Sequence, residues 1–201
     1  MTEHYFSNKP QSESSPKTWK YRLRQKEYTF TSDVGVFSKH EVDFGSKLLI
    51  EQFSAPDVDG GILDVGCGYG PIGIVLADQF PERQILMIDV NERAVKLAEK
   101  NAAQNAVHNV AFQESNLFSG IKEKQFAAIV TNPPIRAGKK IVHAILDESY
   151  HALLEGGALW VVIQKKQGAP SAKEKLKERF GHVDIIARNK GYYLLRSVKY
   201  S

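Results

Sequence analysis

The sequence predicts a protein of the α/β class, with a doubly wound, mostly parallel sheet of seven strands and an antiparallel C-terminal edge strand. From residue 61 onward, short apolar runs of strand length alternate with segments of helical periodicity. The apolar runs show no in–out alternation, which is typical of strands buried on both faces of a parallel sheet. The last two runs flank Asn189-Lys190-Gly191, a tight-turn signal that predicts an antiparallel pair.

Length and composition narrow the class of protein. The chain has 201 residues, 42% of them hydrophobic and 25% charged, which is typical of one folded domain. No apolar run approaches the roughly 20 residues of a membrane helix, and the N-terminus has no apolar secretion signal. Cys67 is the single cysteine, so no intrachain disulfide can form and a cysteine-based zinc site is not expected. We expect a cytoplasmic protein with no metal and no membrane partner, and its oligomeric state stays open.

The N-terminal segment differs in composition from the rest. Residues 7–18 are polar and include two prolines and four serines. We therefore expect a flexible basic N-terminal extension at residues 1–27 and a single domain at residues 28–201. The domain is expected to open with a strand at 28–31 and a short helix at 43–53.

The doubly wound part follows in order from local patterns. Pro71 suits the first position of a helix, Asn91 can cap the next helix, and Ser171 is a possible cap of the last one. The expected strands are residues 62–65, 84–88, 109–112, 126–130, 157–163, 183–187 and 192–198. The expected helices are residues 71–80, 92–104, 139–154 and 171–180.

A glycine-rich loop, Gly66-Cys67-Gly68-Tyr69-Gly70, follows the first of these strands. Such a loop lets a ligand approach the backbone at the carboxyl edge of a doubly wound sheet. Asp89 ends the next strand, where a carboxylate can accept hydrogens from both hydroxyls of a ribose. The spacing Gly68-x-Gly70-x-x-Gly73 also matches the dinucleotide fingerprint. Asp64, however, would lie beside a pyrophosphate, whereas it suits a cationic ligand.

The loop therefore favours S-adenosylmethionine, which carries a sulfonium and an amino group, over a dinucleotide or a purely structural turn. The lysine of a phosphate-binding P-loop is missing from the segment. Cys67 is interpreted as a small buried side chain rather than a nucleophile, since no His/Asp arrangement supports covalent catalysis.

A second motif, Asn132-Pro133-Pro134, follows the strand at 126–130 and opens onto the same edge. Two prolines supply no N–H donors, so carbonyl oxygens and the Asn132 amide oxygen remain as acceptors. Acceptors suit an exocyclic NH2 group, whose lone pair they could turn toward an electrophilic methyl. A purely structural turn is the alternative, and the order of the motifs disfavours it.

These motifs resemble those of class I S-adenosylmethionine-dependent methyltransferases, Rossmann-like enzymes, with an N/D-P-P-x amino-methylating motif. Gly35-Val36-Phe37-Ser38 and the segment Val42–Leu49 resemble the opening of the small methyltransferase domain family. Its best-known members are bacterial ribosomal RNA guanine-N2 methyltransferases acting on small-subunit RNA. The resemblance covers about residues 27–200.

The resemblance implies a role for each motif residue. Asn132, Pro133, Pro134 and Ile135 would orient the target amine. Relatives often have an aspartate where Asn116 stands and an aromatic residue where Ile135 stands, so Ile135 offers an apolar contact without stacking. The expected cofactor-binding residues are Phe37, Ser38, Asp64, Gly66, Cys67, Gly68, Gly70, Asp89, Val90, Asn91, Asn116 and Asn132.

Positive charge is concentrated in the last third, where residues 132–201 carry 13 Lys or Arg and 6 Asp or Glu. A polyanionic partner would explain this asymmetry, and an ordinary solvated surface is the alternative. A second basic cluster spans Lys17 to Lys26. Five basic residues follow the fourth and fifth strands and could meet phosphates around the cleft: Arg136, Lys139, Lys140, Lys165 and Lys166.

The leading hypothesis is methyl transfer from S-adenosylmethionine to an exocyclic amine of RNA, above all guanine-N2 of 16S ribosomal RNA. Ribosomal RNA or the small ribosomal subunit would be the partner. The same cleft could instead methylate adenine-N6, a protein glutamine or a small amine. A non-catalytic cofactor-binding protein of RNA or ribosome assembly and a dinucleotide oxidoreductase are further alternatives.

Overall fold

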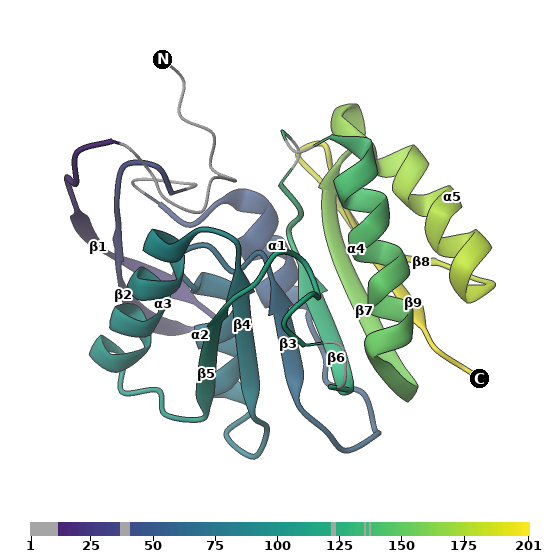
Figure 1. Ribbon diagram of the computed structural model, residues 1–201, viewed down its shortest axis with the longest axis horizontal. Coiled ribbons are helices and arrows are strands. Elements are labelled where there is room, and N and C mark those ends of the chain that lie inside the picture. Colours follow the sequence, from purple (N-terminus) through teal and green to yellow (C-terminus); the bar gives the residue numbers. More distant parts are fainter. Residues whose placement is uncertain (1–11, 37–40, 122–123, 135, 137) are drawn as a thin grey trace.

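The computed structural model describes residues 12–36, 41–121, 124–134, 136 and 138–201. Its centre is a seven-stranded sheet in the order β5-β4-β3-β6-β7-β9-β8 (Figure 1). The parallel strands are β3 (Ile62–Val65), β4 (Ile85–Asp89), β5 (Val110–Glu114), β6 (Phe126–Thr131) and β7 (Leu153–Gln164). Strand β9 (Tyr192–Val198) runs antiparallel between β7 and the edge strand β8 (Asp184–Asn189). The predicted fold class is confirmed.

Helices cover both faces of the sheet. Helices α1 (Phe44–Gln52), α2 (Pro71–Gln79) and α3 (Glu92–Gln104) form one layer, and α4 (Lys139–Ala152) and α5 (Ala169–Phe180) form the other. Successive residues of one strand enter opposite cores. Ile62 joins the cluster under α1–α3, whereas Leu63 joins the cluster under α4 and α5. This two-sided burial explains why the strands are uninterrupted apolar runs.

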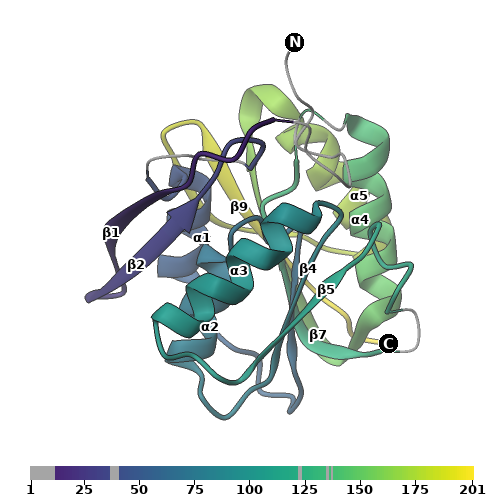
Figure 2. The same ribbon diagram turned by 60° about the vertical axis from the view of Figure 1, so that its left-hand side comes forward.

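A β-hairpin occupies residues 17–32, where a flexible extension was predicted as far as residue 27. Strands β1 (Lys17–Leu23) and β2 (Lys26–Ser32) pair antiparallel and stand beside α1 and α3 (Figure 2). The extension prediction was wrong for residues 17–27 because the polar, solvent-facing half of β1 dominates its composition. The inward side chains of β1, which alternate with that half, are Trp19, Tyr21 and Leu23.

Asn101 of α3 fastens this hairpin to the fold. Its side chain is fully buried. The oxygen accepts a hydrogen bond from the Thr31 N–H, and the nitrogen donates to the carbonyls of Thr31 and Tyr69, all at 2.8 Å. One amide therefore joins β2, α3 and the glycine-rich loop that contains Tyr69.

The helix ends match the predicted ones within a few residues, with one correction. The predicted cap Ser171 lies inside α5, whose N-cap is Gly168. The Ser171 hydroxyl instead forms a hydrogen bond of 2.8 Å with His143 Nε2 of α4, and so joins the two helices. Within the described part of the chain, none of the helices has the length and apolar character that crossing a membrane requires.

We predict that Asn101→Ala lowers the free energy of unfolding by about 3 kcal/mol, because three buried backbone groups lose their partners. Chemical denaturation of the purified variant measures this. Lys100→Ala, at an exposed position on the same helix, is the control and should change stability by less than about 0.5 kcal/mol. Equal stabilities of the two variants would contradict the role assigned to Asn101.

Candidate functional site

The two sequence motifs meet at the carboxyl edge of the sheet. Val65 and Thr131 are register partners in the parallel strands β3 and β6. The Thr131 hydroxyl also donates to the Val65 carbonyl at 3.0 Å. Gly66 and Asn132 are therefore the first residues beyond two adjacent strand ends, which lie about 4.8 Å apart in a sheet.

The glycine-rich loop presents open backbone at this edge. The N–H groups of Gly66 and Cys67 both donate to the Ile88 carbonyl at 2.9 Å, which fixes the loop on β4. Gly66 and Gly68 have positive φ angles of 71° and 58°. A Cβ added at either position would meet nothing within 4 Å. A ligand can thus approach these glycines directly.

Asp64, the third residue of β3, has an unusual carboxylate. Its side chain is buried, and Oδ2 accepts a hydrogen bond of 3.0 Å from the Gly73 N–H. Its Oδ1 is buried as well and has no hydrogen-bond partner among the described residues. Burial raises the pKa of Asp64 to about 7, and the charge of Asp89 adds to the shift. An unpartnered buried carboxylate oxygen of this kind is suited to bind a positively charged group.

Asp89 ends β4 and faces the loop. Its Oδ2 accepts from the Gly68 N–H at 2.9 Å, and its Oδ1 accepts from the Asn91 N–H at 2.8 Å. Burial raises the pKa of Asp89, and these two bonds act against that shift. Each carboxylate oxygen keeps a lone pair for a further donor, so the group can still accept hydroxyl hydrogens.

The next candidates, Val90, Asn91 and Asn116, lie around this carboxylate. The Asn91 side chain caps α3 and donates to the Gly35 carbonyl at 3.0 Å, so its amide is used by the fold. Its backbone is used as well, since the Asn91 N–H donates to Asp89 and the Asn91 carbonyl accepts the Val95 N–H at 3.1 Å. Val90 is partly exposed. Asn116 is exposed just beyond β5, where the Ser115 N–H donates to the Asp89 carbonyl at 2.9 Å.

Cys67 offers no nucleophile. Its thiol is buried, lies 3.4 Å from the Gly68 carbonyl oxygen, and has its pKa raised by burial. A thiol in this state is largely protonated and unreactive at neutral pH. The described ranges also hold no group of three or more His, Cys, Asp and Glu side chains arranged to bind a metal ion.

Asn132 is held by contacts that the sequence reading missed. Its amide nitrogen donates to Asp43 Oδ2 at 2.8 Å and to the Ser46 hydroxyl oxygen at 3.1 Å. The amide oxygen is therefore the end that remains to accept a hydrogen bond. Pro133 is buried and Pro134 partly exposed. Two sequence signals include Asp43: its N-cap pattern, an aspartate three residues before a helical serine, and the segment Val42–Leu49 that resembles the family.

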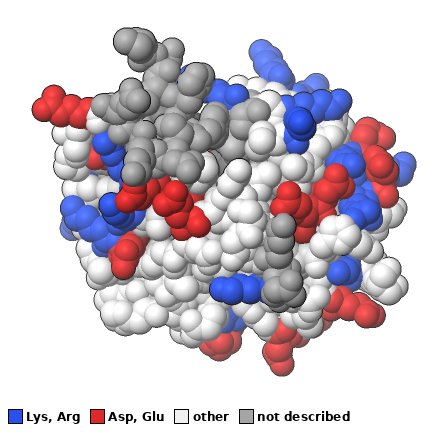
Figure 3. Space-filling view, in the orientation of Figure 1, with Lys and Arg blue, Asp and Glu red and all other residues white. Residues whose placement is uncertain are grey.

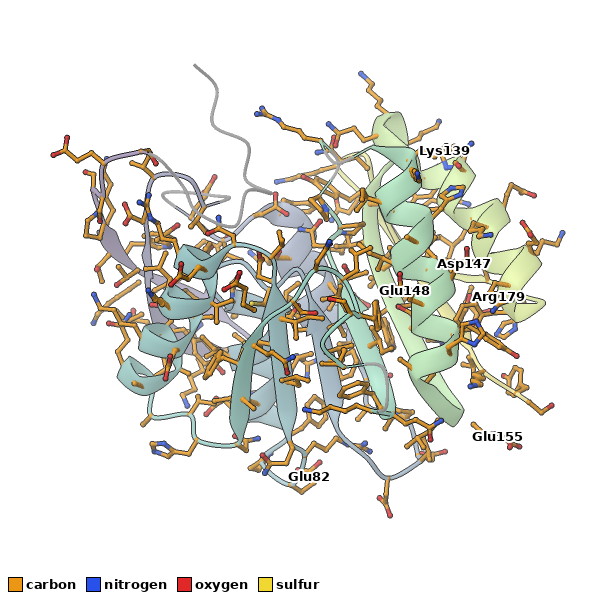
Figure 4. All side chains as sticks on the ribbon, in the orientation of Figure 1. Glu82, Lys139, Asp147, Glu148, Glu155 and Arg179 are labelled. Carbon is orange, nitrogen blue, oxygen red and sulfur yellow. The ribbon has the colours of Figure 1, made fainter. Side chains whose placement is uncertain are left out.

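A basic rim borders the site. Lys139 and Lys140 begin α4, and Figures 3 and 4 show Lys and Arg side chains gathered over this end of the helix, with Lys139 labelled. Lys190 lies in the turn between β8 and β9. This turn lies beside Lys165, because the Lys165 N–H donates to the Gly191 carbonyl at 2.8 Å. The sequence reading missed Lys190 as a rim residue. The exposed residues of the rim are Arg136, Lys139, Lys140, Lys165, Lys166 and Lys190.

The second predicted basic cluster, Lys17–Lys26, is partly engaged in the fold. Arg24 donates to the carbonyls of Ile50 and Phe53 at the C-terminal end of α1. Lys26 pairs with Asp78 near the end of α2 at 2.8 Å. These helix ends lie at the edge of the sheet opposite the glycine loop. The predicted site residues Phe37, Ser38 and Ile135 lie outside the described residues.

Comparison of the sequence with known proteins identifies a family and a relative. A family model described as "Methyltransferase small domain" matches residues 27–196. YbxB of Bacillus subtilis (strain 168), described as an uncharacterized protein, is 60% identical over 200 residues, covering 99% of this chain and 100% of YbxB.

Solved structures share the fold. A Thermus thermophilus RsmC structure, titled as a 16S rRNA N2 G1207 methyltransferase with AdoMet and guanosine, matches with a TM-score of 0.81 and 24% identity. The match covers 92% of this chain but 50% of the RsmC chain, so this chain spans half the length of that one. A ribosomal protein L11 methylase from Lactobacillus delbrueckii matches with a TM-score of 0.64 and 24% identity, covering 78% of this chain and 77% of that chain.

Close packing requires a glycine at position 73, the third glycine of the Gly68-x-Gly70-x-x-Gly73 spacing. A Cβ at this position would lie 2.5 Å from Met87 Sδ and 3.0 Å from Asp64 Oδ2. We predict that Gly73→Ala destabilises the protein by about 1–3 kcal/mol, despite the better helix propensity of alanine.

The double variant Gly73→Ala/Met87→Ala tests the cause, because removing the methionine side chain makes room for the new methyl group. Thermodynamic double-mutant cycles should give a favourable coupling energy between the two changes. Strict additivity of the two losses would show that the contact with Met87 is not the reason for glycine.

Proposed function

The chain belongs to the methyltransferase small domain family, and on that premise we propose that it methylates an exocyclic amine of RNA, above all guanine-N2 of small-subunit ribosomal RNA. Its family is one of S-adenosylmethionine-dependent methyltransferases, so the cofactor is S-adenosylmethionine. The observation that carries the proposal is the amide of Asn132. Its nitrogen is taken by Asp43 and Ser46, which leaves an oxygen acceptor beside the glycine loop.

The residues present fit this cofactor. The unpartnered Oδ1 of Asp64 suits the amino group of its methionine part, because a buried carboxylate oxygen gains most from a cationic partner. Gly66 and Gly68 have no Cβ to obstruct that part. Asp89, oriented by two backbone N–H groups, has acceptors left for the ribose hydroxyls.

When bound, S-adenosylmethionine supplies a sulfonium methyl group, which the amine nitrogen takes up while sulfur keeps the bonding electron pair and the nitrogen loses one proton to water. Asn132 and the Pro133 carbonyl would accept the N–H hydrogens of the amine. This orients its lone pair, which is otherwise delocalised into the ring. No strong base is needed, so positioning supplies the rate enhancement.

The basic rim supports RNA as the substrate class. Its six exposed cations follow β6 and β7 or lie in the β8–β9 turn, all at the edge where Asn132 stands. Phosphate contacts at this place would set the register of a nucleic acid over the acceptor oxygen. A neutral small amine would draw no benefit from such a rim.

The proposed function is tested with labelled methyl from S-adenosylmethionine and a panel of acceptors, followed by nucleoside analysis. The panel contains small ribosomal subunits that lack methylation, large subunits, free ribosomal RNA, transfer RNA and a protein extract. We expect N2-methylguanosine from small-subunit RNA. Label in protein, or in another nucleoside, would overturn the proposed substrate and leave the family assignment intact.

We predict that Asn132→Ala reduces the rate of methyl transfer at least about 100-fold, because the amine loses its orienting acceptor. Affinity for S-adenosylmethionine, measured by calorimetry, should stay within a few-fold. Asn105→Ala, which removes a structural asparagine at the far end of α3, is the control and should leave the rate unchanged. Full activity of Asn132→Ala would place the site elsewhere.

We predict that affinity for S-adenosylmethionine rises as pH increases through about 7. Burial raises the pKa of Asp64 to about 7, and the cationic cofactor favours the ionised carboxylate. Below that pKa the carboxyl must release a proton on binding, which costs about tenfold in affinity per pH unit. Calorimetry between about pH 5.5 and about pH 8.5 measures how steeply the affinity for S-adenosylmethionine changes with pH.

Asp64→Asn should weaken binding at high pH and remove this part of the slope, since an amide does not titrate. An unchanged slope in Asp64→Asn would assign the pH dependence to another group.

A further inference from the structure

The carboxylate that binds the Asn132 nitrogen, Asp43, has further contacts that the roles described so far do not use. Asp43 lies at the N-cap of α1, and its Oδ2 accepts both the Ser46 N–H at 3.2 Å and the Asn132 amide at 2.8 Å. Its Oδ1 accepts the hydroxyl of Tyr192 at 3.3 Å. Three elements from distant parts of the sequence, α1, β6 and β9, therefore converge on a single side chain.

The chemistry of this carboxylate decides which way the Asn132 amide points. An ionised carboxylate only accepts hydrogen bonds, so it can face the NH2 end of an amide and not the oxygen end. Turning the Asn132 amide by 180° would place two oxygens close to the 2.8 Å that now separates nitrogen and oxygen, and would lose a charge-assisted hydrogen bond. Asp43 thereby keeps the acceptor end of Asn132 free for the substrate.

Asp43 is itself held in place by Tyr192, which packs against α1 on the same side of the sheet. The Gln164 amide donates to the Tyr192 hydroxyl oxygen at 2.7 Å, so that hydroxyl has its hydrogen free for Asp43. Burial raises the pKa of Tyr192, which keeps it a donor. A Cβ at Gly45 would lie 2.7 Å from Tyr192 Cε1, so the glycine makes room for the ring.

We propose that Asp43 is a positioning residue that selects the catalytic orientation of the Asn132 amide, with Tyr192 and Gln164 as its supports. This rests on the proposed function, in which Asn132 accepts hydrogens of the substrate amine. Asp43 acts on the orientation of the acceptor. The cofactor site at Asp64 and Asp89 does not depend on it.

The test compares Asp43→Asn with wild type in methyl transfer, using the panel acceptor that wild type methylates fastest. Asparagine is as good an N-cap as aspartate, so α1 should stay folded. It can present either end of its amide, however, and no longer enforces the orientation of Asn132. We expect kcat to fall about 10- to 100-fold, with KM and cofactor affinity within about threefold of wild type.

Asp78→Asn is the matched control. Asp78 also accepts a tyrosine hydroxyl, that of Tyr28 at 2.6 Å, but it lies near the end of α2 away from the site. Its substitution removes similar structural bonds and should leave kcat unchanged. An Asp43→Asn enzyme with wild-type kcat, or an equal loss in Asp78→Asn, would overturn the proposal.

Exchanging the carboxylate and the amide between positions 43 and 132 gives a measurement that would not change if Asp43 had only a structural role. In Asn132→Asp two carboxylates face each other, and kcat should fall below that of Asp43→Asn and recover at lower pH as one of them is protonated. The double variant Asp43→Asn/Asn132→Asp restores a donor–acceptor pair and should regain at least about tenfold over Asn132→Asp. Absence of this recovery contradicts the proposal.

A second measurement separates this proposal from the proposed function. In nitrogen-15-labelled protein, the side-chain NH2 signal of Asn132 is assigned by its loss in Asn132→Asp. We expect these hydrogens to exchange slowly with water in wild type and at least about tenfold faster in Asp43→Asn. Equal exchange rates would refute the role of Asp43. Failure of every panel acceptor with wild type would instead refute the proposed substrate.

Discussion

The parallel pairing of β3 with β6 places the first residues of both motifs side by side, since Val65 and Thr131 are register partners. Each strand end contributes what the other lacks: β3 leads into open glycine backbone, and β6 leads into an acceptor followed by two prolines. A shift of one residue would turn every side chain of β6 to the other face of the sheet. The two buried cores under the helix layers fix this register and thereby the site.

One residue of the site, Asp64, lowers the stability of the free protein and favours the binding of a cationic ligand. Asp64 is a buried carboxylate with one unpartnered oxygen, and burial raises its pKa to about 7. Because the folded-state pKa lies above the unfolded one, the unfolded chain releases this proton first, and Asp64 costs stability as pH rises from about 4 to about 7. A cationic ligand would offset that cost. The same oxygen that weakens the free protein therefore selects the charge of its ligand.

The sequence predicted those parts of the molecule that depend on local periodicity. Strand and helix patterns of this kind are local. The motif residues Asp64, Asp89 and Asn132 were predicted from the sequence because each lies in or directly after the end of a largely apolar strand. The hairpin strand β1 was missed because its outward lysines and arginine conceal the alternation of Trp19 and Tyr21. Asp43 lies 89 positions in sequence from Asn132, and Tyr192 lies 149 positions from Asp43. Local sequence patterns carry no signal for contacts between residues so far apart.

A crystal structure with S-adenosylmethionine bound tests the central claim most directly, because it locates the methyl group relative to Asn132. We expect the amino group at Asp64, the ribose hydroxyls at Asp89 and the methyl group directed toward the Asn132 amide oxygen, with the amide nitrogen still on Asp43. A methyl group directed away from Asn132, or an amide turned with its oxygen toward Asp43, would contradict the account.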